Sequence, residues 1–553
     1  RYDDDAHVLR AWLPHFSQFG LGEGLTPSGD QLPSVEAFTA DILSGGAGAS
    51  VPFETPVGLG GLKPNLGLSY SSVTMDDLYL AGGDNAMTAQ AGAGGFGWNL
   101  GGVSYIVRTD GQGDDDTLDG DKTFALVLNG DRMAVTFVDE HWHTNPEIFA
   151  RISWAGSVLS GTRDYAGWTV TTVDGVRYDF GDAFAYDGYR QDSATAYALA
   201  NTNGGETFRQ GRRWYLRQVT DPRGNSMEYH YKTERAYKTC QVEANWVDNG
   251  WNWYTSSVDP LEITWSGNAS QGVDYKLRAI FVYSTTARTD TQVENWAPGS
   301  CNAAYAAQPL VGLWNKLSGL VVQVQDSGGY WQQLRSYDLV QGTQTFNAPA
   351  AKQRPYLISV SARGQSGGLL RKYSFTYAFS NLNQVWLTKA DNGWGGSVTY
   401  SYEDYRVSCA ASVCGARNLR YPISTTVAYD GPSGWARNSV QTNYYYGADE
   451  AGSEGGAVAD DRGFLGFKLV AITHTEVNTP AVVLQREEVR SYEDGAGASR
   501  GNPDPRHGKI KERKILDAAG NVLQVTAYAW QAYWFLDGAW SETPTGTSWR
   551  IND

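Results

Sequence analysis

The sequence predicts an all-β protein made of short strands and tight turns. Its 553 residues include 64 Gly, 33 Tyr and 20 Trp but only 4 Met. Aromatic side chains fit the pleated, half-buried surface of a sheet, and glycine supplies the positive φ angles of tight turns. Short apolar stretches alternate with Gly- and Pro-containing turns from residue 32 onward. We find no convincing amphipathic helix longer than two turns, and residues 37–43 are the best short helix candidate.

Two hairpins are predicted from their turn residues. One turns at Asn129-Gly130 and the other at Asp174-Gly175, because both dipeptides suit the positive φ angles of hairpin turns. Alternate residues in each arm are apolar, so one side of each hairpin should pack inward. The inward residues are Phe124, Leu126 and Leu128 in the first hairpin and Val176, Tyr178 and Phe180 in the second.

Several later strands carry tyrosine or phenylalanine at every second position, which places large rings in a row on one strand face. Segments of this kind are residues 227–231, 373–379, 398–402 and 442–447. Turn signals separate the strands, and they include residues 221–225, Asn392-Gly393 and residues 519–521. The repetition is irregular and lacks the strict period of a solenoid or a propeller.

Composition argues against two broad classes of protein. The chain has 44 Lys and Arg against 60 Asp and Glu, a formal net charge of −16, whereas nucleic-acid binding needs a basic surface. No stretch approaches the ~18 consecutive apolar residues of a membrane-spanning helix. The chain begins at Arg1 without a signal-peptide pattern, so we expect that a signal has been removed or that the chain is a fragment. It ends at Asp553 after an aromatic run, and we expect a missing C-terminal portion.

Four cysteines leave two interpretations open. An even, low number is compatible with two disulfides in an oxidising compartment or with four buried thiols. Four residues separate the last two cysteines, a spacing that a small disulfide loop tolerates. A zinc site is disfavoured because neither a His ligand nor a second close Cys pair lies nearby. The disulfide candidates are Cys240, Cys301, Cys409 and Cys414.

An acidic, Gly-rich run at residues 109–122 is a candidate calcium loop. Calcium takes six to eight oxygen ligands and suits flexible, oxygen-rich loops, although the spacing here is not that of an EF-hand. The alternative is a solvated acidic turn between two strands. The candidate ligands are Asp110, Asp114, Asp116, Asp119 and Asp121.

Other candidate sites are weaker. His141 and His143 lie two apart and would share one face of a strand, but no third metal ligand is evident, which favours a polar hairpin end. No nucleophile elbow, P-loop or zinc-protease motif is present, so we expect a non-enzyme within these residues. A cluster of aromatic residues either forms a glycan-binding platform or fills an inward face, which we favour. Its members are Trp246, Trp251, Trp253 and Tyr254.

Seven stretches resemble the Rhs/YD-repeat superfamily, and specifically the SpvB-like N-terminal region and the B component of insecticidal Tc toxins. Each is only a turn-rich β pattern, but their joint occurrence in this order is specific, and they span most of residues 32–530. The stretches are residues 50–72, 94–110, 168–181, 214–231, 392–402, 460–470 and 510–524.

The resemblance implies a long spiralling antiparallel sheet of YD-type hairpins that forms part of a hollow shell. On this basis we expect a lead-in segment at residues 1–31, an SpvB-like β region at 32–200 and a shell region at 201–553. Two Gly-rich motifs, at 95–98 and 463–467, are expected to let backbones approach closely around a large ring. The sequence departs from the family because the connections leave no room for an inserted β-propeller. The acidic autoproteolytic segment and the variable toxin do not appear by Asp553.

The resemblance implies a secreted or surface-displayed scaffold without a cofactor of its own, calcium aside. Its partner would be the C-terminal remainder of the same polypeptide, enclosed as cargo, with a delivery apparatus as a further partner. The alternative is an extracellular adhesin that uses the same shell to bind glycans or neighbouring cells. An enzyme acting on polysaccharides is the least favoured hypothesis, because no catalytic constellation emerges from the sequence.

Overall fold

The computed structural model describes 27 separate parts of the chain, which divide between two units, Arg1–Ser34 and Val35–Asp553. In the first unit, β1 (Tyr2–Asp3) pairs antiparallel with β2 (Val8–Leu9). No helix in the described part of the chain is long and apolar enough to cross a membrane. The described residues are 2–3, 8–9, 38–40, 45–73, 91–108, 124–138, 140–155, 167–182, 193–201, 207–237, 253–288, 290, 313–345, 353–379, 385–393, 396–402, 405–406, 419–420, 427–430, 440–447, 457–460, 463–476, 479–492, 506, 508–536, 539–541 and 548–552.

The second unit begins with a four-stranded antiparallel sheet, which we call the N-terminal sheet. Its strands, in order, are β3 (Phe38–Ala40), β4 (Ala47–Phe53), β5 (Leu66–Ser71) and β6 (Trp98–Gly101). Buried and accessible residues alternate along β4 and β5, as expected for strands with one packed face. The helix predicted at residues 37–43 is wrong where it overlaps β3, because pairing with β4 overrides a weak local helical preference.

A second group of strands folds around tryptophan side chains. Trp142, Trp168 and Trp214 surround Phe124, with ring centroids between 4.9 and 6.0 Å from it. β15 (Thr207–Thr220) belongs to two ladders: its first half pairs with β14 and its last residues pair with β13 and β16. The other strands of the group are β7 (Tyr105–Arg108), β8 (Phe124–Leu128), β9 (Asp131–Val138), β10 (His141–Asn145), β11 (Arg151–Ala155), β12 (Gly167–Thr171), β13 (Arg177–Gly181) and β14 (Thr195–Asn201).

The first predicted hairpin is confirmed, and the second differs in its turn. Asn129 and Gly130 both have positive φ, 55° and 104°, and form the two-residue turn between β8 and β9. The second turn takes five residues, because Thr171 pairs with Arg177 and only Gly175 of the predicted pair has positive φ. The inward faces agree with the prediction for Phe124, Leu126, Leu128 and Phe180, which are buried, whereas Val176 and Tyr178 are half-buried.

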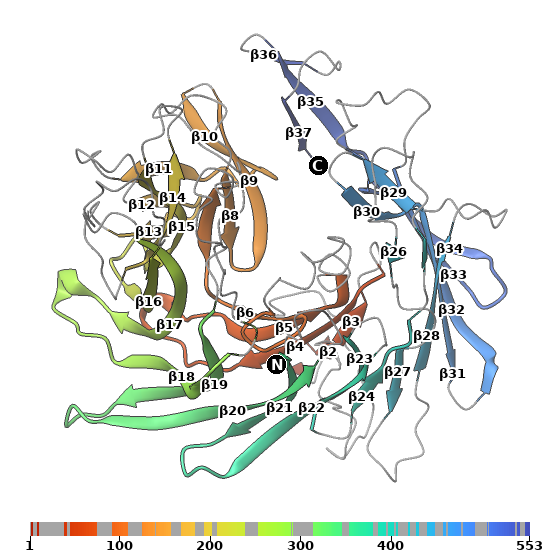
Figure 1. Ribbon diagram of the computed structural model, residues 1–553. Coiled ribbons are helices and arrows are strands. Elements are labelled where there is room, and N and C mark those ends of the chain that lie inside the picture. The colour runs from red at the N-terminus through yellow and green to blue at the C-terminus, as the bar shows by residue number, and fades with distance from the viewer. Residues whose placement is uncertain are drawn as a thin grey trace, which may run out of the picture. The chain divides into compact units, whose positions relative to one another are not determined.

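From β11 onward, antiparallel pairing continues strand by strand through most of the chain, which we call the long sheet (Figure 1). The all-β prediction with a long antiparallel sheet is thus confirmed. In the described ladders the series runs from β11 to β34 without closing into a barrel. Its members beyond β15 are β16 (Ser226–Tyr237), β17 (Trp253–Gly267), β18 (Leu277–Ala287), β19 (Asn315–Gln325), β20 (Trp331–Thr345), β21 (Gln353–Arg363), β22 (Leu369–Phe379), β23 (Val385–Asp391), β24 (Ser397–Thr399), β27 (Val427–Asp430), β28 (Val440–Gly447), β31 (Leu469–Glu476), β32 (Thr479–Ser491), β33 (Ile510–Leu516) and β34 (Val522–Ala527).

Short elements accompany the long sheet. Two 3-10 turns, η2 (Leu59–Gly61) and η4 (Ala269–Gln271), lie in connections. Three small pairings involve β25 (Tyr405–Arg406) with β26 (Leu419–Arg420), β29 (Ala457–Asp460) with β30 (Gly463–Phe467), and β35 (Gln531–Leu536) with β36 (Ala539–Ser541) and β37 (Ser548–Asn552).

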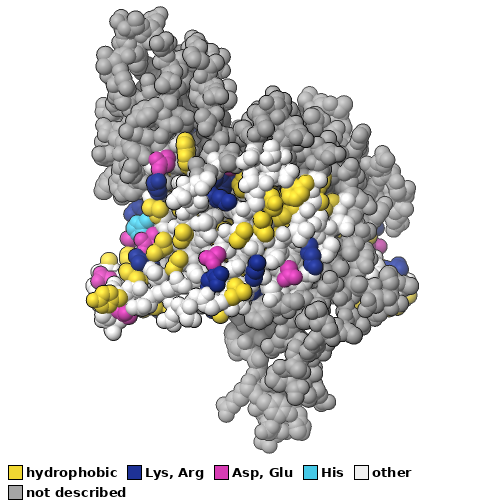
Figure 2. Space-filling view, turned by 60° about the horizontal axis from the view of Figure 1, so that its bottom comes forward, with side chains coloured by type: hydrophobic (Ala, Val, Ile, Leu, Met, Phe, Trp, Pro, Cys, Tyr) yellow, Lys and Arg dark blue, Asp and Glu magenta, His cyan; other side chains and the backbone are white. Residues whose placement is uncertain are grey.

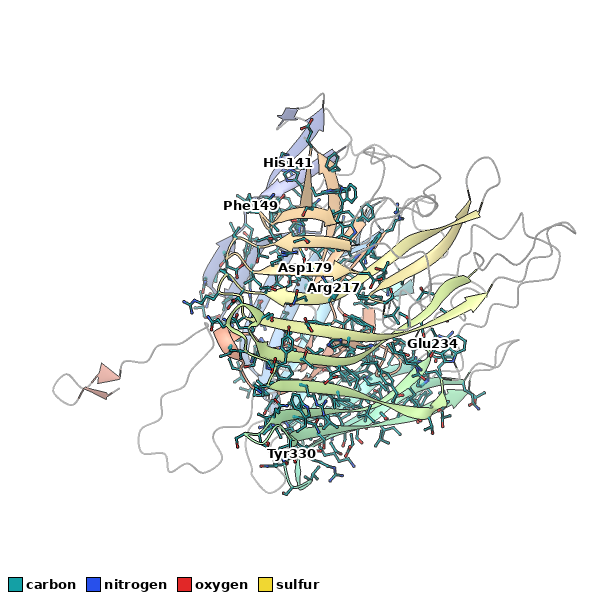
Figure 3. All side chains as sticks on the ribbon, turned by 90° about the vertical axis from the view of Figure 1, so that its left-hand side faces the viewer. His141, Phe149, Asp179, Arg217, Glu234 and Tyr330 are labelled. Atoms are coloured by element: carbon teal, nitrogen blue, oxygen red, sulfur yellow. The ribbon has the colours of Figure 1, made fainter. Side chains whose placement is uncertain are left out.

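Three hairpins of the long sheet share one five-residue turn, with Asp first and Gly fourth. In residues 221–225 the Asp221 carboxylate accepts hydrogen bonds from the backbone N–H groups of Arg223 and Asn225, at 2.8 and 2.9 Å. Residues 326–330 and 517–521 repeat this arrangement, and Figure 3 shows Tyr330 at such a hairpin tip. The predicted turns at 221–225 and 519–521 are confirmed.

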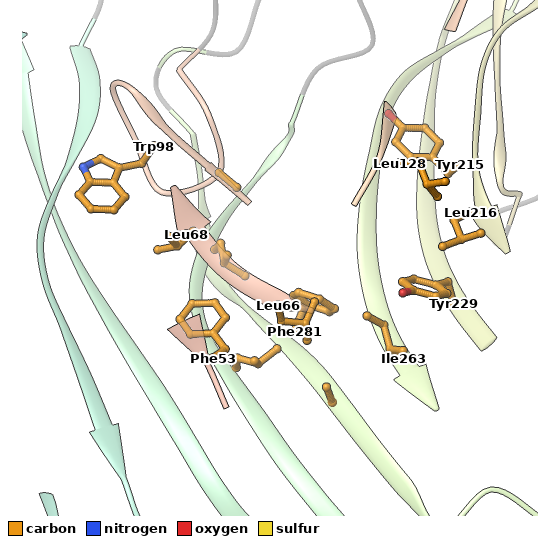
Figure 4. Packing of buried hydrophobic residues seen from close by; sticks show 14 of the residues in the cluster. Phe53, Leu66, Leu68, Trp98, Leu128, Tyr215, Leu216, Tyr229, Ile263 and Phe281 are labelled. Atoms are coloured by element: carbon orange, nitrogen blue, oxygen red, sulfur yellow. The ribbon is translucent and has the colours of Figure 1, made fainter. Parts of the chain in front are cut away.

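The main core includes the tryptophan group and continues between the N-terminal sheet and one face of the long sheet, which we call the inner face (Figure 4). Leu66 and Leu68 of β5 contribute from one side, and Phe281 and Ile263 from the other. The opposite face of the long sheet carries partly exposed apolar side chains between charged ones (Figure 2). Leu261, Val282, Val340 and Ile358 on β17, β18, β20 and β21 are 38–48% exposed.

Candidate functional site

Most of the sequence-predicted site residues lie outside the described part of the chain. This holds for all five candidate calcium ligands and for all four cysteines. It also holds for Trp246 and Trp251. Trp253 and Tyr254 begin β17, but only their backbone is described. These predictions therefore stay predictions. Those left open are Asp110, Asp114, Asp116, Asp119, Asp121, Cys240, Cys301, Cys409 and Cys414.

His141 and His143 lie on one exposed face of β10, on either side of the buried Trp142, as the two-residue spacing predicts. His143 Nδ1 lies 3.1 Å from a carboxylate oxygen of Glu147. Among the described residues, no three His, Cys, Asp or Glu side chains come together in a way that would hold a metal ion.

The most extensively built feature is the junction of the N-terminal sheet with the inner face of the long sheet. Side chains that alternate along β20 and β22 meet rings from the N-terminal sheet. The ring of Phe53 lies 4.7 Å from that of Tyr337, and the ring of Trp98 lies 4.5 Å from that of Phe375. Aromatic pairs at these distances contribute beyond the apolar area they bury. We call this junction the brace.

Hydrogen bonds of aromatic side chains cross the brace at four strands of the long sheet and at the residue that follows β24. Tyr337 on β20 accepts from the backbone N–H of Glu54 at 2.7 Å, and Tyr377 on β22 accepts from Trp98 Nε1 at 2.8 Å. Two bonds reach the backbone of β23 and β4: Leu387 N–H donates to Tyr70, and Tyr400, which follows β24, donates to Gly48. On β17, Trp265 Nε1 donates to the carbonyl of Pro56 at 3.0 Å.

The hydroxyls of Tyr337 and Tyr377 are held away from water, which favours their protonated form. Burial raises the pKa of Tyr377 well above its usual value, although the hydrogen bond from Trp98 acts in the opposite direction. Burial likewise raises the pKa of Tyr337. A protonated phenol both donates and accepts, so each tyrosine fastens a backbone or indole group without carrying a charge.

The glycine segment at residues 91–98 is pressed against the long sheet. Phe96 N–H donates to the carbonyl of Pro355 at 2.8 Å. Gly95 has φ +109°, and a Cβ there would lie 2.8 Å from backbone atoms of Pro355 and Tyr356. Phe96 is buried beneath the guanidinium of Arg354, 5.1 Å from the ring centroid. The predicted close approach of backbones beside a large ring is confirmed at Gly95, whereas the neighbour of Gly97 is the ring of Tyr70.

A buried ion pair fixes the start of the same segment. Arg288 binds Asp290 through two hydrogen bonds of 2.9 and 2.8 Å, and both side chains are almost fully buried. The same guanidinium donates to the carbonyls of Ala91 and Gly92, while Asp290 accepts from Ala91 N–H at 3.0 Å. The two side chains hydrogen-bond to each other and to three backbone groups of a segment that is distant in the sequence. These hydrogen bonds offset the desolvation cost of burying two charges.

A second buried carboxylate lies nearby on β17. Asp259 is fully buried; one of its oxygens accepts a 2.6 Å hydrogen bond from Asn315, and the other has no partner among the described residues. Burial raises the pKa of Asp259 to about 6, although Asn315, Lys232 and Arg288 act in the opposite direction.

Some residues of the brace lie in patterns that the sequence shows, and the buried charged residues do not. The tyrosine ladders at 373–379 and 398–402 contain Tyr377 and Tyr400, so the alternating pattern pointed to the brace. Arg288, Asp290 and Asp259 carried no signal, because a single charged residue in a strand-rich segment usually lies in solvent.

Comparisons with known proteins give fold similarities only. No family model and no curated protein matches the chain. The crystal structure of TcdB2-TccC3-TEV is similar over 92% of this chain and 30% of its own, with 12% identity and a TM-score of 0.40. For the Photorhabdus luminescens Tc holotoxin pore the shares are 95% and 27%, with 15% identity and a TM-score of 0.37.

The N-terminal domain of effector protein SpvB from Salmonella typhimurium strain LT2 is similar over 57% of this chain and 98% of its own. Its identity is 14% and its TM-score is 0.32. The chain thus spans less than a third of either Tc toxin chain and nearly all of the SpvB domain. Tc toxin components and SpvB are also the proteins that the sequence motifs resemble.

Proposed function

We propose that the chain forms part of the wall of a Tc-toxin-like shell that encloses a polypeptide cargo encoded further along the same gene. The role of the chain itself is steric: the wall separates the cargo from its surroundings until delivery. The proposal places the protein outside the cell that makes it, either secreted or on the cell surface. Its partners are the remainder of its own polypeptide and a delivery apparatus.

The brace is the observation that carries the proposal. A single-layer antiparallel sheet twists and bends readily. Here the N-terminal sheet is fastened at β17, β20, β22, β23 and the end of β24, so these strands are held in one fixed curvature. Such fastening suits a wall that must keep its form around contents, and it supports the family expectation drawn from the motifs.

The first test is the mass of the native gene product under denaturing conditions without reduction. We expect a separate C-terminal fragment that purifies together with this chain under native conditions. A single species with no companion peptide would contradict enclosure, and would favour the adhesin alternative, in which the same sheet displays binding loops.

The second test asks whether the brace protects the companion fragment from protease. The double variant Tyr377→Phe/Tyr400→Phe removes two hydroxyls of the brace, so we expect cleavage of the companion to be several times faster than in the wild type. Tyr330→Phe is the matched control, because Tyr330 lies exposed at a hairpin tip. Circular dichroism should show that all three proteins are folded. Equal rates of cleavage in the three would contradict a protective role of the brace.

A further inference from the structure

Asp259 lies in a group of charges that is not balanced. Lys232 on β16, its register partner, lies 2.7 Å from the carboxylate of Glu234. Arg288, which follows β18, uses two of its nitrogens on Asp290. Each nearby cation thus has its own carboxylate. Asp259 forms no ion pair among the described residues, and one negative charge of the group is left uncompensated.

The remaining surroundings of Asp259 are polar or aromatic, without charge. Asn315 on β19 donates to one carboxylate oxygen. Tyr283 on β18 donates to the carbonyl of Pro260 and, like Tyr215 on β15, lies close enough for its pKa to be raised by the charge of Asp259, after the larger effect of burial. β14 also contacts β17, and its described side chains, Thr195 and Ala196, are uncharged.

The buried polar atoms at this place are incompletely satisfied. Asp259 Oδ1 has no hydrogen-bond partner among the described residues, and neither has Ser257 Oγ. Ser257 lies two residues earlier on the same face of β17 and is also fully buried. A buried, unpaired ionised oxygen is costly, and a neutral carboxyl group costs far less.

We propose that Asp259 is a proton-binding site within the long sheet, and that uptake of one proton by its carboxylate stabilises the packing of β16 to β19 in mildly acidic solution. Protonation removes the uncompensated charge without breaking an ion pair, because Lys232 and Arg288 keep their own carboxylates. The new O–H group can donate a hydrogen bond, while the oxygen facing Asn315 continues to accept. This behaviour is independent of whether the chain encloses cargo.

The direction of the pH effect follows from proton linkage. The pKa of Asp259 is raised from 3.8 to about 6 in the folded chain, so the folded state binds the proton more tightly than the unfolded state. The stabilisation is fully present below the unfolded pKa and is lost as the pH rises through about 6. At neutral pH the ionised Asp259 destabilises the fold.

The test compares the wild type with Asp259→Asn, which keeps the size of the side chain and removes its charge. Equilibrium unfolding in urea is followed by tryptophan fluorescence across a pH series. From about pH 7.5 to about pH 5, the folding constant of the wild type should rise about tenfold relative to that of the variant. At neutral pH the variant should be the more stable protein.

The controls separate this site from other titrating groups. Asp338→Asn removes an exposed carboxylate on β20 that pairs with Arg363, and its pH dependence should follow the wild type. Burial lowers the pKa of His474, but this residue is present in both proteins and its effect cancels from the comparison. Parallel curves for the wild type and Asp259→Asn would overturn the proposal. So would failure of both Asp259→Asn and Asp259→Leu to fold at neutral pH, because removing the charge should stabilise the chain.

Discussion

Arg288 and Asp290 form the most deeply buried ion pair among the described residues, and each stabilises the protein only while the other is present. The guanidinium donates hydrogen bonds to one carboxylate and two backbone carbonyls, and these contacts lie inside the protein. Removing one partner of such a pair leaves the other as an uncompensated buried charge. The pair therefore stabilises the attachment of residues 91–98 only as a unit.

Substituting Arg288→Met should destabilise the protein by about 3–5 kcal/mol, because Asp290 stays charged and buried while two carbonyls lose their donor. Urea unfolding at neutral pH measures the change. The matched control is Arg363→Met, which breaks an exposed pair with Asp338 and should cost less than about 1 kcal/mol. An equal loss of unfolding free energy in the two variants would show that the buried pair stabilises the protein no more than the exposed pair does.

The hairpins with the Asp-first, Gly-fourth turn are the repeating element of the long sheet. In residues 517–521 the Asp517 carboxylate accepts from the backbone N–H and the side-chain amide of Asn521, both at 2.8 Å. These hydrogen bonds, the side-chain bond first, lower the pKa of Asp517. The contacts are made to the ionised form, so the turn depends on the charge of its first residue.

Replacing Asp517→Ala should loosen the β33–β34 hairpin at neutral pH, measured as faster amide hydrogen exchange in that hairpin. A lowered pKa means that the stabilisation is present above the usual Asp value of 3.8 and is lost as the pH falls below it. The difference between variant and wild type should therefore disappear in strong acid. Asp274→Ala, at an exposed position outside a turn of this kind, should have no effect at either pH. A difference that persists in acid would contradict the role of the charge.

Elements set by local patterns were predictable, and those set by distant partners were not. The Asn129-Gly130 turn and the inward row of Phe124, Leu126 and Leu128 follow from neighbouring residues alone. Residues 37–43 have a helical pattern, but Phe38–Ala40 pairs with β4 as a strand. The partners of Arg288 in the N-terminal segment lie 196 and 197 positions away, a distance over which a sequence pattern carries no signal.

Within the second unit, most paired strands are close in the sequence, whereas the brace joins residues that are far apart in the sequence. The β8–β9 hairpin closes over two residues, whereas the brace joins Glu54 to Tyr337, Trp98 to Tyr377 and Gly48 to Tyr400. The residues in these three brace contacts are separated by 283, 279 and 352 positions in the sequence. Closing such loops costs more entropy than closing a hairpin, so the brace should form late in folding.

Pulse-labelled hydrogen exchange during refolding would time these events. We expect the backbone N–H groups of the β8–β9 hairpin to become protected before those of Phe96 and Leu387, which bond to Pro355 and Tyr70 across the brace. The measurement reports each amide separately, so the hairpin is an internal control. Protection of Phe96 and Leu387 at the same time as the hairpin would mean that the brace forms in the earliest phase.

The span of the brace also bears on the protein's synthesis. The ribosome makes Gly48 long before Tyr400, so the N-terminal sheet leaves the exit tunnel with no inner face to receive it. Its apolar side chains are covered in stages: Leu66 and Leu68 share a core with Ile263 and Phe281, whereas Trp98 meets Phe375 and Tyr377. Until those partners have been made, the side chains stay available to chaperones. A product truncated before residue 375 lacks the partners of Trp98, and the hydrogen bond from Tyr400 to Gly48 forms only in a longer chain.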